Sequence, residues 1–296
     1  MIRSFHHSDF PLERLLREKR ETITAILPAR KVADTIGRIV AELQALDPLV
    51  DQILVIDAAS HDGTADIARG LGAEVHQESE LLPEFGQALG KGDAMWRALT
   101  VARGELLVYL DSDTRDFSGH FATGMLGPLV TGEPVDFVKG TFQRPFTTPT
   151  GERRARDGGR VTELMARPVL SAFYPELAKF GQPLAGEVAG RRSLFEAIPF
   201  ATGYAVEMEM LLDARDEVGA SRMAEVDLDE RLNYHQPLQH LGPMAYAVLR
   251  VVLERLRREG RLRDDHAPPL QTADGRLVQV EIVKRPPYAS VRAATS

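Results

Sequence analysis

Runs of aliphatic residues alternate along the chain with segments whose apolar residues recur at helical spacing. The aliphatic runs predict buried strands over residues 22–27, 53–57 and 106–110, and the more mixed segment 135–142 predicts a further strand. Apolar positions from Ile36 to Leu43 predict a helix over about 35–46, with Asp34 as its N-cap. Because strands and helices alternate, we expect an α/β fold with a largely parallel sheet.

The most apolar of these runs, residues 106–110, ends at two acids, Asp111 and Asp113. In open α/β sheets ligands bind at the carboxyl ends of the strands. Two carboxylates one residue apart can share a hard cation there, so we predict a Mg²⁺ (or Mn²⁺) site for a nucleotide diphosphate. The pattern arises by chance about once in a chain of this length. A second copy stands at Asp227-Leu228-Asp229, so the prediction depends on position after a buried strand.

Two glycine-containing segments at helix starts suit anion binding. Gly-Lys-Gly at 90–92 allows close approach and adds a point charge, and Gly-Arg-Val-Thr at 159–162 adds a guanidinium. The alternatives are a solvated turn lysine and a capped helix with a solvated arginine. Trp96, the only tryptophan, is predicted to pack on a helix face. Residues 144–160 are predicted to form a mobile loop.

The second half carries further candidates. A very apolar helix over 203–212 bears Glu207 and Glu209, and either one needs a partner if it is buried. After a strand at 224–228, Arg231, Asn233 and His235 alternate and would share one face of extended chain. Residues 242–259 form a basic amphipathic helix. The tail after 264, with a strand-like run at 278–283, is either an arm that swaps onto a partner or a poorly ordered end.

Composition excludes several classes of protein. The 296 residues allow one large domain or two intimate ones, and a net charge of −7 argues against a general nucleic-acid binder. The absence of cysteine excludes disulfides and thiolate metal sites. The chain start lacks the apolar core of a signal peptide, and no run reaches the ~18 apolar residues of a membrane span. We therefore expect a cytoplasmic protein without nucleic-acid or membrane partners.

Taken together, six motifs resemble the retaining glucosyl-3-phosphoglycerate synthases and, more broadly, the mannosyl-3-phosphoglycerate synthases. The resemblance covers residues 22–255, and the segments 159–164 and 182–187 are its most specific parts. The motifs are Leu27-Pro28-Ala29, Gly90-Lys91-Gly92 with Trp96-Arg97, Asp111-Ser112-Asp113, Gly159-Arg160-Val161-Thr162-Glu163-Leu164, Gln182-Pro183-Leu184-Ala185-Gly186-Glu187, and Gly203-Tyr204 with Val206-Glu207. The resemblance implies a GT-A glycosyltransferase fold, a Rossmann-like sheet followed by an acceptor-binding C-terminal part.

The resemblance also implies residue roles. Donor-binding residues would be Pro28, Ala29, Arg30, Val32, Asp57, Ala58, Lys91, Gly92, Asp111, Ser112 and Asp113. Acceptor-binding residues would be Gly159, Arg160, Val161, Thr162, Arg231 and His235. Asp113, Asn233 and His235 would be the metal ligands, and Asp113, Lys91 and Glu207 the catalytic residues. The predicted parts are an N-terminal arm (1–20), a nucleotide-sugar half (21–143), an acceptor half of the same domain (144–240) and a C-terminal helix and tail (241–296).

Three departures from the family pattern leave questions open. Arg30-Lys31-Val32 stands where Leu-Asn-Glu is usual, and Ala58 replaces a serine, so the donor is either a UDP or a GDP sugar. The usual metal-binding histidine position is Asn233, with His235 two residues later. Either His235 reaches the metal after a local shift, or Asn233 supplies a weaker oxygen ligand, or metal affinity is reduced.

The reaction that the resemblance implies is transfer of glucose from UDP-glucose, or another nucleotide-glucose, to the 2-hydroxyl of 3-phosphoglycerate. Retention would follow from front-face attack, with double displacement through Glu207 as the rival. The alternatives are a mannosyl-3-phosphoglycerate synthase that uses GDP-mannose and a non-catalytic sugar-nucleotide-binding protein. A sugar-nucleotide nucleotidyltransferase is disfavoured, because its glycine-rich signature does not match residues 28–31. The resemblance also suggests a homodimer, with residues 242–259 and the tail as candidate contacts.

Overall fold

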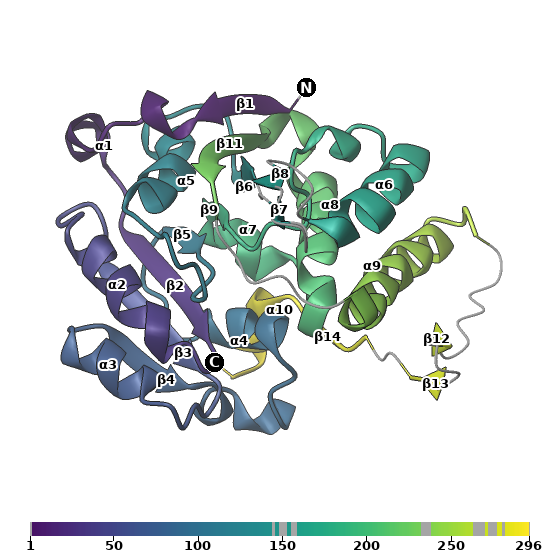
Figure 1. Cartoon of the computed structure of the whole chain (residues 1–296), viewed down its shortest axis with the longest axis horizontal. Coiled ribbons are helices and arrows are strands. Elements are labelled where there is room, and N and C mark those ends of the chain that lie inside the picture. Colours follow the sequence, from purple (N-terminus) through teal and green to yellow (C-terminus); the bar gives the residue numbers. More distant parts are fainter. Residues whose placement is uncertain are drawn as a thin grey trace.

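A computed structural model describes residues 2–143, 146–147, 153–154, 159–231, 238–262, 270–271, 277–279 and 282–295. Its centre is an eight-stranded sheet of order β1-β11-β6-β9-β5-β2-β3-β4 (Figure 1). The strands are β1 (Arg3–His6), β2 (Ile23–Ala29), β3 (Gln52–Asp57), β4 (Glu74–Gln77), β5 (Leu106–Tyr109), β6 (Phe137–Gln143), β9 (Val188–Arg191) and β11 (Met223–Glu230). Only β9 runs antiparallel to its neighbours in this sheet. The predicted α/β fold with a largely parallel sheet is confirmed.

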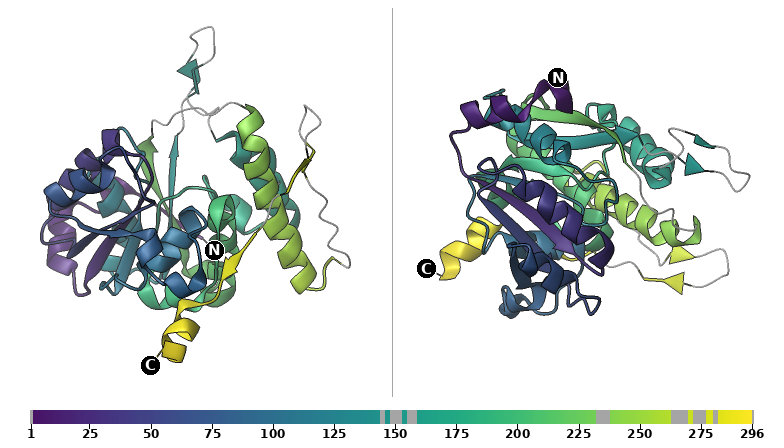
Figure 2. Two further views of the ribbon diagram at one scale, coloured as in Figure 1. Left: turned by 90° about the horizontal axis from the view of Figure 1, so that it is seen from below. Right: turned by 60° about the vertical axis from the view of Figure 1, so that its left-hand side comes forward.

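Helices cover both faces of the sheet and enclose two separate hydrophobic cores (Figure 2). Alternation along the strands divides the side chains, so that Ala25 and Leu27 pack on one face and Ile26 on the other. The first face carries α1 (Leu12–Glu18), α2 (Ala33–Gln44), α3 (Thr64–Gly70) and α5 (His120–Val130). The second carries α4 (Lys91–Ala98), α6 (Arg167–Phe173), α7 (Arg192–Ala197), α8 (Val206–Val218), α9 (Leu238–Arg258) and α10 (Tyr288–Thr295). None of these described helices is both long enough and apolar enough to cross a membrane.

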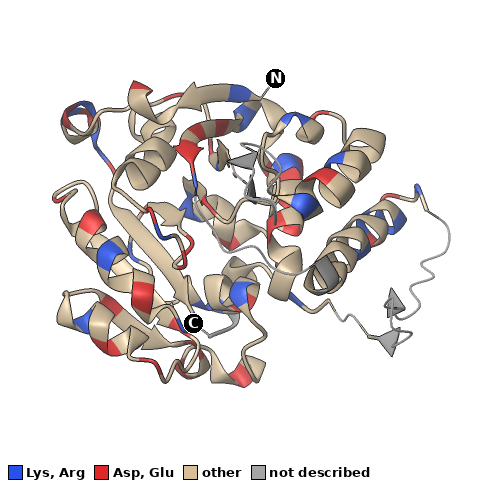
Figure 3. Ribbon diagram, in the orientation of Figure 1, with Lys and Arg blue, Asp and Glu red and all other residues tan. Residues whose placement is uncertain are grey.

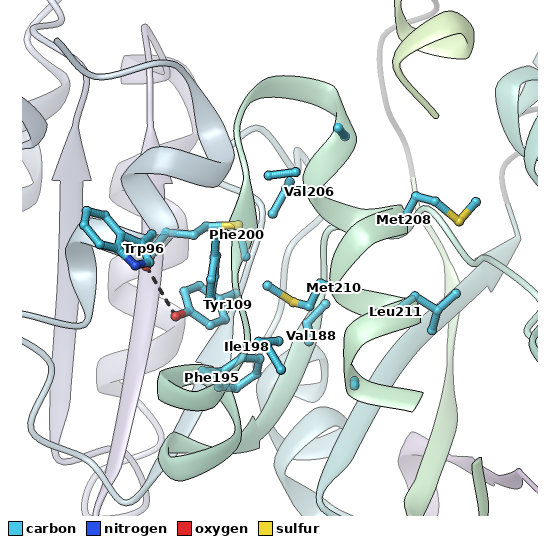
Figure 4. Packing of buried hydrophobic residues seen from close by; sticks show 14 of the residues in the cluster. Trp96, Tyr109, Val188, Phe195, Ile198, Phe200, Val206, Met208, Met210 and Leu211 are labelled. Carbon is cyan, nitrogen blue, oxygen red and sulfur yellow. Dashed lines mark hydrogen bonds between the residues drawn. The ribbon is translucent and has the colours of Figure 1, made fainter. Parts of the chain in front are cut away.

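Aromatic packing joins α4 to the central strand β5. Trp96 is fully buried, as predicted, and lies beside Tyr109 and Phe200 (Figure 4). The Tyr109 hydroxyl donates to the Met95 carbonyl oxygen at 3.4 Å, and the ring meets Phe195 edge-on at a centroid distance of 5.1 Å. This packing fixes the position of α4 relative to the end of β5, where the aspartates follow.

The N-terminal segment is more than the predicted arm or helix. Arg3–His6 form β1, which pairs in parallel with β11, and a 3-10 helix at His7–Asp9 and α1 at Leu12–Glu18 follow it. The sequence Arg-Ser-Phe-His carries too little apolar alternation to predict a strand. Its extended conformation depends on hydrogen bonds to β11, more than 200 residues away in the chain, so the local pattern could not show it.

The helix predicted over 35–46 exists as α2, but its N-cap prediction was wrong. Asp34 lies within the first turn, and Val32 occupies the cap position without a side-chain capping bond of its own. The Val32 amide donates to Thr64 Oγ1 at 3.0 Å, and the Ala33 amide donates to Asp62 Oδ2 at 3.1 Å. The loop after β3 therefore caps the helix after β2, which couples the first two strand–helix turns at the carboxyl edge of the sheet.

The described part of the tail returns to its own chain. β14 (Lys284–Arg285) pairs with β10 (Phe200–Ala201), and the Trp96 indole donates to the Pro286 carbonyl oxygen at 2.9 Å. Of the strand predicted over 278–283, residue 278 lies in β13 (Leu277–Val278), which pairs with β12 (Leu270–Gln271); residues 279, 282 and 283 are not in a strand, and 280–281 lie outside the described residues. Residues 282–295 are thus an ordered part of this fold and pack beside α4.

Most of the predicted mobile loop, 144–160, lies outside the described residues. Two short strands within it, β7 (Phe146–Thr147) and β8 (Arg153–Arg154), pair with each other. The mobility of the loop stays a prediction.

Candidate active site

Asp111, Ser112 and Asp113 follow β5 at the carboxyl edge of the sheet, as the sequence predicted. The Ser112 hydroxyl donates to the Pro28 carbonyl oxygen at 2.7 Å, and the Thr35 hydroxyl donates to the Ser112 carbonyl oxygen at 2.6 Å. Ser112 is buried, so its side chain serves this attachment to the turn after β2. These bonds hold the two aspartates in place beside the first strand–helix turn.

Asp111 is held between two cations. Its Oδ1 lies 2.5 Å from Lys91 Nζ, and its Oδ2 lies 2.9 Å from Arg231 Nη2. Burial alone would raise the pKa of Asp111, but the ammonium and guanidinium groups hold this pKa well below its ordinary value. A Cβ at Gly186 would stand 2.1 Å from Asp111 Oδ1, so only glycine fits under this carboxylate. Asp111 is therefore ionised and fixed.

Asp113 differs from Asp111 in its exposure. Its side chain is 65% exposed and contacts Arg231 Nη2 at 3.2 Å through Oδ1. An accessible carboxylate beside a fixed one is the oxygen-donor chemistry that Mg²⁺ and Mn²⁺ prefer. The residues present therefore fit a divalent metal, and the role of Asp113 as its ligand stays a prediction.

Lys91, the first residue of α4, bridges two acids from distant parts of the chain. Its Nζ donates to Asp111 and, at 2.9 Å, to Glu207 Oε1 at the start of α8. Burial would lower the pKa of Lys91, but these two carboxylates raise it above its ordinary value. Lys91 is thus a fixed positive charge at the edge of the site.

The glycine after this lysine has a structural explanation. A Cβ at Gly92 would stand 2.0 Å from the Ala201 carbonyl oxygen of β10, so glycine permits the close contact of α4 with that strand. Gly92 was predicted to bind the donor. Its observed contact fixes the position of Lys91, and a donor contact from Gly92 stays a prediction.

Arg231 is buried among carboxylates. Besides Asp111 and Asp113, its Nη1 reaches Glu187 Oε1 at 2.5 Å, and its side chain is only 1% exposed. Burial would lower the pKa of Arg231, but the three acids raise it above its ordinary value. The sequence assigned Arg231 to the acceptor; the structure places it between the two members of the aspartate pair and Glu187.

Lys139 and Glu187 belong to this network and were not singled out from the sequence. Lys139 is buried on β6, and its Nζ donates to the Ala185 carbonyl oxygen at 2.6 Å. Burial lowers the pKa of Lys139 to about 8, although the neighbouring carboxylates oppose the shift. The sequence motif at 182–187 could have indicated both residues. It supplies Glu187 itself, Gly186, and the Ala185 carbonyl oxygen to which Lys139 donates.

The residues predicted to hold the nucleoside gather around the ends of β2 and β3. Asp57 is buried, and its Oδ2 accepts bonds of 3.0 Å each from the Ser60 amide and from Gln77 Nε2. The Ala58 amide donates to the Ala29 carbonyl oxygen at 2.9 Å, which joins the two turns. Arg30 is exposed and Val32 partly exposed on the same edge. The structure brings these residues together, and their contacts with a donor stay a prediction.

The residues predicted to hold the acceptor start the helical segment that leads through Thr162–Ala166 into α6. Gly159 has a left-handed φ of 74°, and Arg160 and Val161 are partly exposed whereas Thr162 is buried. In α6, Arg167 donates to the carbonyl oxygens of Ala178, Phe180 and Gly181. This helix therefore supports the chain that leads to Gly186 and Glu187. Asn233 and His235 lie outside the described residues.

Known proteins share both this sequence and this fold. Glycosyl transferase family 2 matches residues 24–202. A glucosyl-3-phosphoglycerate synthase from Petrotoga mobilis is 39% identical over 311 residues, which cover 98% of this chain and 94% of that protein. Its counterpart from Mycobacterium tuberculosis H37Rv is 40% identical over 237 residues, which cover 79% and 73% of the two chains.

Solved structures agree with these matches. The crystal structure of mannosyl-3-phosphoglycerate synthase from Rubrobacter xylanophilus has a TM-score of 0.89 and 48% identity, covering 98% of this chain and 97% of that one. Glucosyl-3-phosphoglycerate synthase from M. tuberculosis, in complex with Mn²⁺, UDP-glucose and phosphoglyceric acid, has a TM-score of 0.87 and 34% identity, covering 98% and 99%. The fold and the edge site are those of a GT-A glycosyltransferase. The chain belongs to glycosyl transferase family 2 and, within it, to the glucosyl-3-phosphoglycerate synthase family.

Proposed function

We propose that this chain transfers glucose from UDP-glucose to the 2-hydroxyl of 3-phosphoglycerate, giving glucosyl-3-phosphoglycerate. The observation that carries the proposal is the fixed aspartate pair. Lys91 and Arg231 neutralise Asp111 and leave Asp113 accessible, in a chain that matches a glucosyl-3-phosphoglycerate synthase over 98% of its length.

The divalent metal, Mg²⁺ or Mn²⁺, is assigned to Asp113. The second protein ligand would be Asn233 or His235, which follow Arg231 directly in the chain. When bound, the cation stabilises the negative charge that develops on the diphosphate leaving group. Arg231 contacts both aspartates and so positions them; we assign it this role ahead of direct acceptor binding.

Lys91 supplies a second positive charge on the donor side. Because Asp111 and Glu207 hold its ammonium in place, little reorganisation is needed when charge appears on the leaving group. Arg160, with the chain from Gly159 to Thr162, is assigned to the anionic groups of 3-phosphoglycerate, and His235 to the same side.

The proposed step retains configuration by front-face attack. The bond between the sugar C1 and the diphosphate oxygen breaks, the acceptor 2-oxygen bonds to C1 on the same face, and its proton passes to the departing diphosphate. Glu207 would be the nucleophile of a double displacement, but its carboxylate is paired with Lys91. We therefore expect Glu207→Gln to retain measurable transfer. Abolished turnover, together with a trapped glycosyl adduct on Glu207 of the wild type, would favour double displacement instead.

A second candidate, the mannosyl synthase, is favoured by one observation. The chain is 48% identical to the Rubrobacter xylanophilus protein, against 34% to the M. tuberculosis glucosyl synthase in its complex. The decisive experiment compares UDP-glucose, GDP-glucose and GDP-mannose as donors, with purified protein, Mg²⁺ and 3-phosphoglycerate. UDP release that requires 3-phosphoglycerate establishes the glucosyl synthase. Preference for GDP-mannose would identify the chain as a mannosyl-3-phosphoglycerate synthase. Donor binding without turnover would identify a non-catalytic sugar-nucleotide-binding protein.

We also propose a homodimer. Both segments predicted to make the contact pack on their own chain, the described tail beside α4 and α9 through Val251 and Val252, so both stay candidates for the contact (Figure 2). Light scattering after size-exclusion chromatography measures the mass directly. A monomeric mass at working concentration would contradict the proposal.

A further inference from the structure

Two histidines and an aspartate meet at the sheet edge, apart from the aspartate pair at β5. β1 ends at His6, which pairs with Asp227 of β11, and His7 begins the following turn. Asp229 has a left-handed φ of 65°, and its amide donates to Asp227 Oδ1 at 3.0 Å. The register of β11 also shifts between Asp227 and Glu230. This bend directs the Asp229 carboxylate toward the two imidazoles.

The three side chains present their ligand atoms to one another. His6 Nε2 lies 3.0 Å from Asp229 Oδ1, and His7 Nε2 lies 2.7 Å from Asp229 Oδ2. Ligands of a tetrahedral Zn²⁺, at about 2.0–2.1 Å from the metal, stand about 3.4 Å from one another. The three ligand atoms lie within 4.8 Å of one another, so a rearrangement of these side chains would bring them to that spacing. Asp229 is 60% exposed at its side chain, so the outer side is open to a water ligand.

Neighbouring groups hold the imidazoles in orientation. His6 Nδ1 accepts the Ser8 amide at 3.3 Å and lies 2.7 Å from the Ser8 hydroxyl, and these contacts turn Nε2 toward Asp229. The His7 ring packs against His120 at a centroid distance of 4.4 Å. His120 is itself engaged with the Ser118 hydroxyl and the Leu228 carbonyl oxygen, so it supports His7 without being a ligand.

We propose that His6, His7 and Asp229 form a second metal site, which binds a transition-metal dication such as Zn²⁺. Two imidazoles and one carboxylate select Zn²⁺, Co²⁺ or Ni²⁺ over the Mg²⁺ that an all-oxygen site prefers. Among the residues that the structure describes, these three are a group of histidine and acidic ligand atoms that lie within 4.8 Å of one another. The bound ion would link β1 to the end of β11, two residues before Arg231, and stabilise that edge of the sheet.

The test is a Co²⁺ titration of the full chain, free of tag histidines, with saturating Mg²⁺ on the carboxylate site. We expect about one tightly bound Co²⁺ with a tetrahedral d–d absorption band that Zn²⁺ displaces. The variants His6→Gln, His7→Gln and Asp229→Asn should each weaken Co²⁺ binding at least about ten-fold. Asparagine tolerates the left-handed backbone of position 229, so that variant keeps the local fold. His61→Gln, which removes an exposed histidine from another turn, is the matched control and should keep the band.

A thermal readout gives independent support. Zn²⁺ should raise the melting temperature of the wild type and of His61→Gln but not that of Asp229→Asn, because a ligand that binds only the folded state stabilises it. Asp229→Asn should also keep its Mg²⁺-supported glycosyl transfer. Absence of the Co²⁺ band, its persistence in all three ligand variants, or its loss in Asp113→Ala would overturn the proposal. These readouts do not depend on the donor sugar, so they stand apart from the proposed glucosyl transfer.

Discussion

The chain carries the same Asp-x-Asp spacing twice, and the two copies lie in different surroundings at the same edge of the sheet. Asp111 and Asp113 follow β5, between β9 and β2, whereas Asp227 and Asp229 belong to β11, next to the edge strand β1. Figure 3 shows acidic positions at both places. The position of the strand alone therefore does not distinguish the two Asp-x-Asp copies, since both lie at the carboxyl ends of parallel strands.

The partners differ, and they decide the chemistry. In the first copy Lys91 and Arg231 neutralise one carboxylate and leave the other accessible, which suits a hard cation and a diphosphate. In the second copy Asp227 accepts the Asp229 amide, and Asp229 contacts two imidazoles, which suits a softer dication. An Asp-x-Asp motif thus places two carboxylates at the edge of the sheet. Residues from elsewhere in the chain determine which ligand these carboxylates suit.

The largest effect is expected from removing one carboxylate of each copy in turn. Asp113→Asn should lower kcat/KM by about 10²–10³-fold or more, because the metal and the developing charge lose their anchor. Asp229→Asn should keep activity within about two-fold, as expected for a surface position away from the reaction. Nucleoside diphosphate release under saturating 3-phosphoglycerate measures both. An Asp113→Asn enzyme with most of its activity would refute the assignment of the first copy.

The next effect tests the buried partner of the first copy. Arg231→Met leaves the buried Glu187 without its guanidinium and should destabilise the fold by about 3–5 kcal/mol. Urea unfolding followed by circular dichroism gives this difference. The double variant Arg231→Met with Glu187→Gln should recover part of the loss, because the unpaired charge is then removed. Equal stability of the single and double variants would show that the charge pair is not the cause.

A third prediction concerns the tail, which supports the helix carrying Lys91. Arg285 donates to both oxygens of the buried Asp93, at 2.9 and 2.7 Å, and Asp93 also accepts the Leu89 amide before α4. Arg285→Met should cost about 1.5–3 kcal/mol and raise the KM for the donor more than it lowers kcat. The control is Arg292→Met: Arg292 is 61% exposed and its partner Glu196 keeps a second ion pair with Arg192, so the loss should be less than about 1 kcal/mol. Similar losses in both variants would argue against the supporting role.

The smallest effect is a pH dependence from Lys139, on the strand between β11 and β9. Burial lowers its pKa to about 8 in the folded state, below the value near 10.4 of an unfolded chain. The unfolded state therefore binds more protons between these values, and this group makes the fold more stable as pH rises from about 8 to 10. The urea midpoint of Lys139→Met should rise less over that interval than that of the wild type. Parallel pH profiles would contradict the assigned shift.

Local pattern was enough to predict the elements that are apolar in themselves. The strands at 22–27, 53–57 and 106–110 appear as β2, β3 and β5, because each is an aliphatic run whose burial both faces of the sheet require; the mixed segment 135–142 appears as β6. The apolar spacing from Ile36 to Leu43 likewise predicted α2. Asp111 and Asp113 could be placed at a sheet edge for the same reason, since a buried strand must deliver whatever follows it to that edge.

Elements without such a pattern could not be predicted. β1 is a strand because β11 pairs with it, and α2 is capped by residues 62–64 in place of Asp34. The resemblance of the 182–187 motif marked that segment as important, but the contact of Glu187 with Arg231 joins residues 44 positions apart. The side-chain contacts of Asn233 and His235 lie outside the described residues and stay predictions.

The sequence by itself therefore determined the fold class, the order of the apolar strands and helices along the chain, and the aspartate pair with its lysine and arginine candidates. Only the tertiary structure decided that Lys91 and Arg231 hold Asp111, that Asp113 stays exposed, and that His6 and His7 meet Asp229. The physical reason is the separation along the chain of the residues that interact. Hydrophobic periodicity records which face of a local segment is buried, whereas ion pairs and metal ligands depend on which distant segments the sheet topology brings to the same edge.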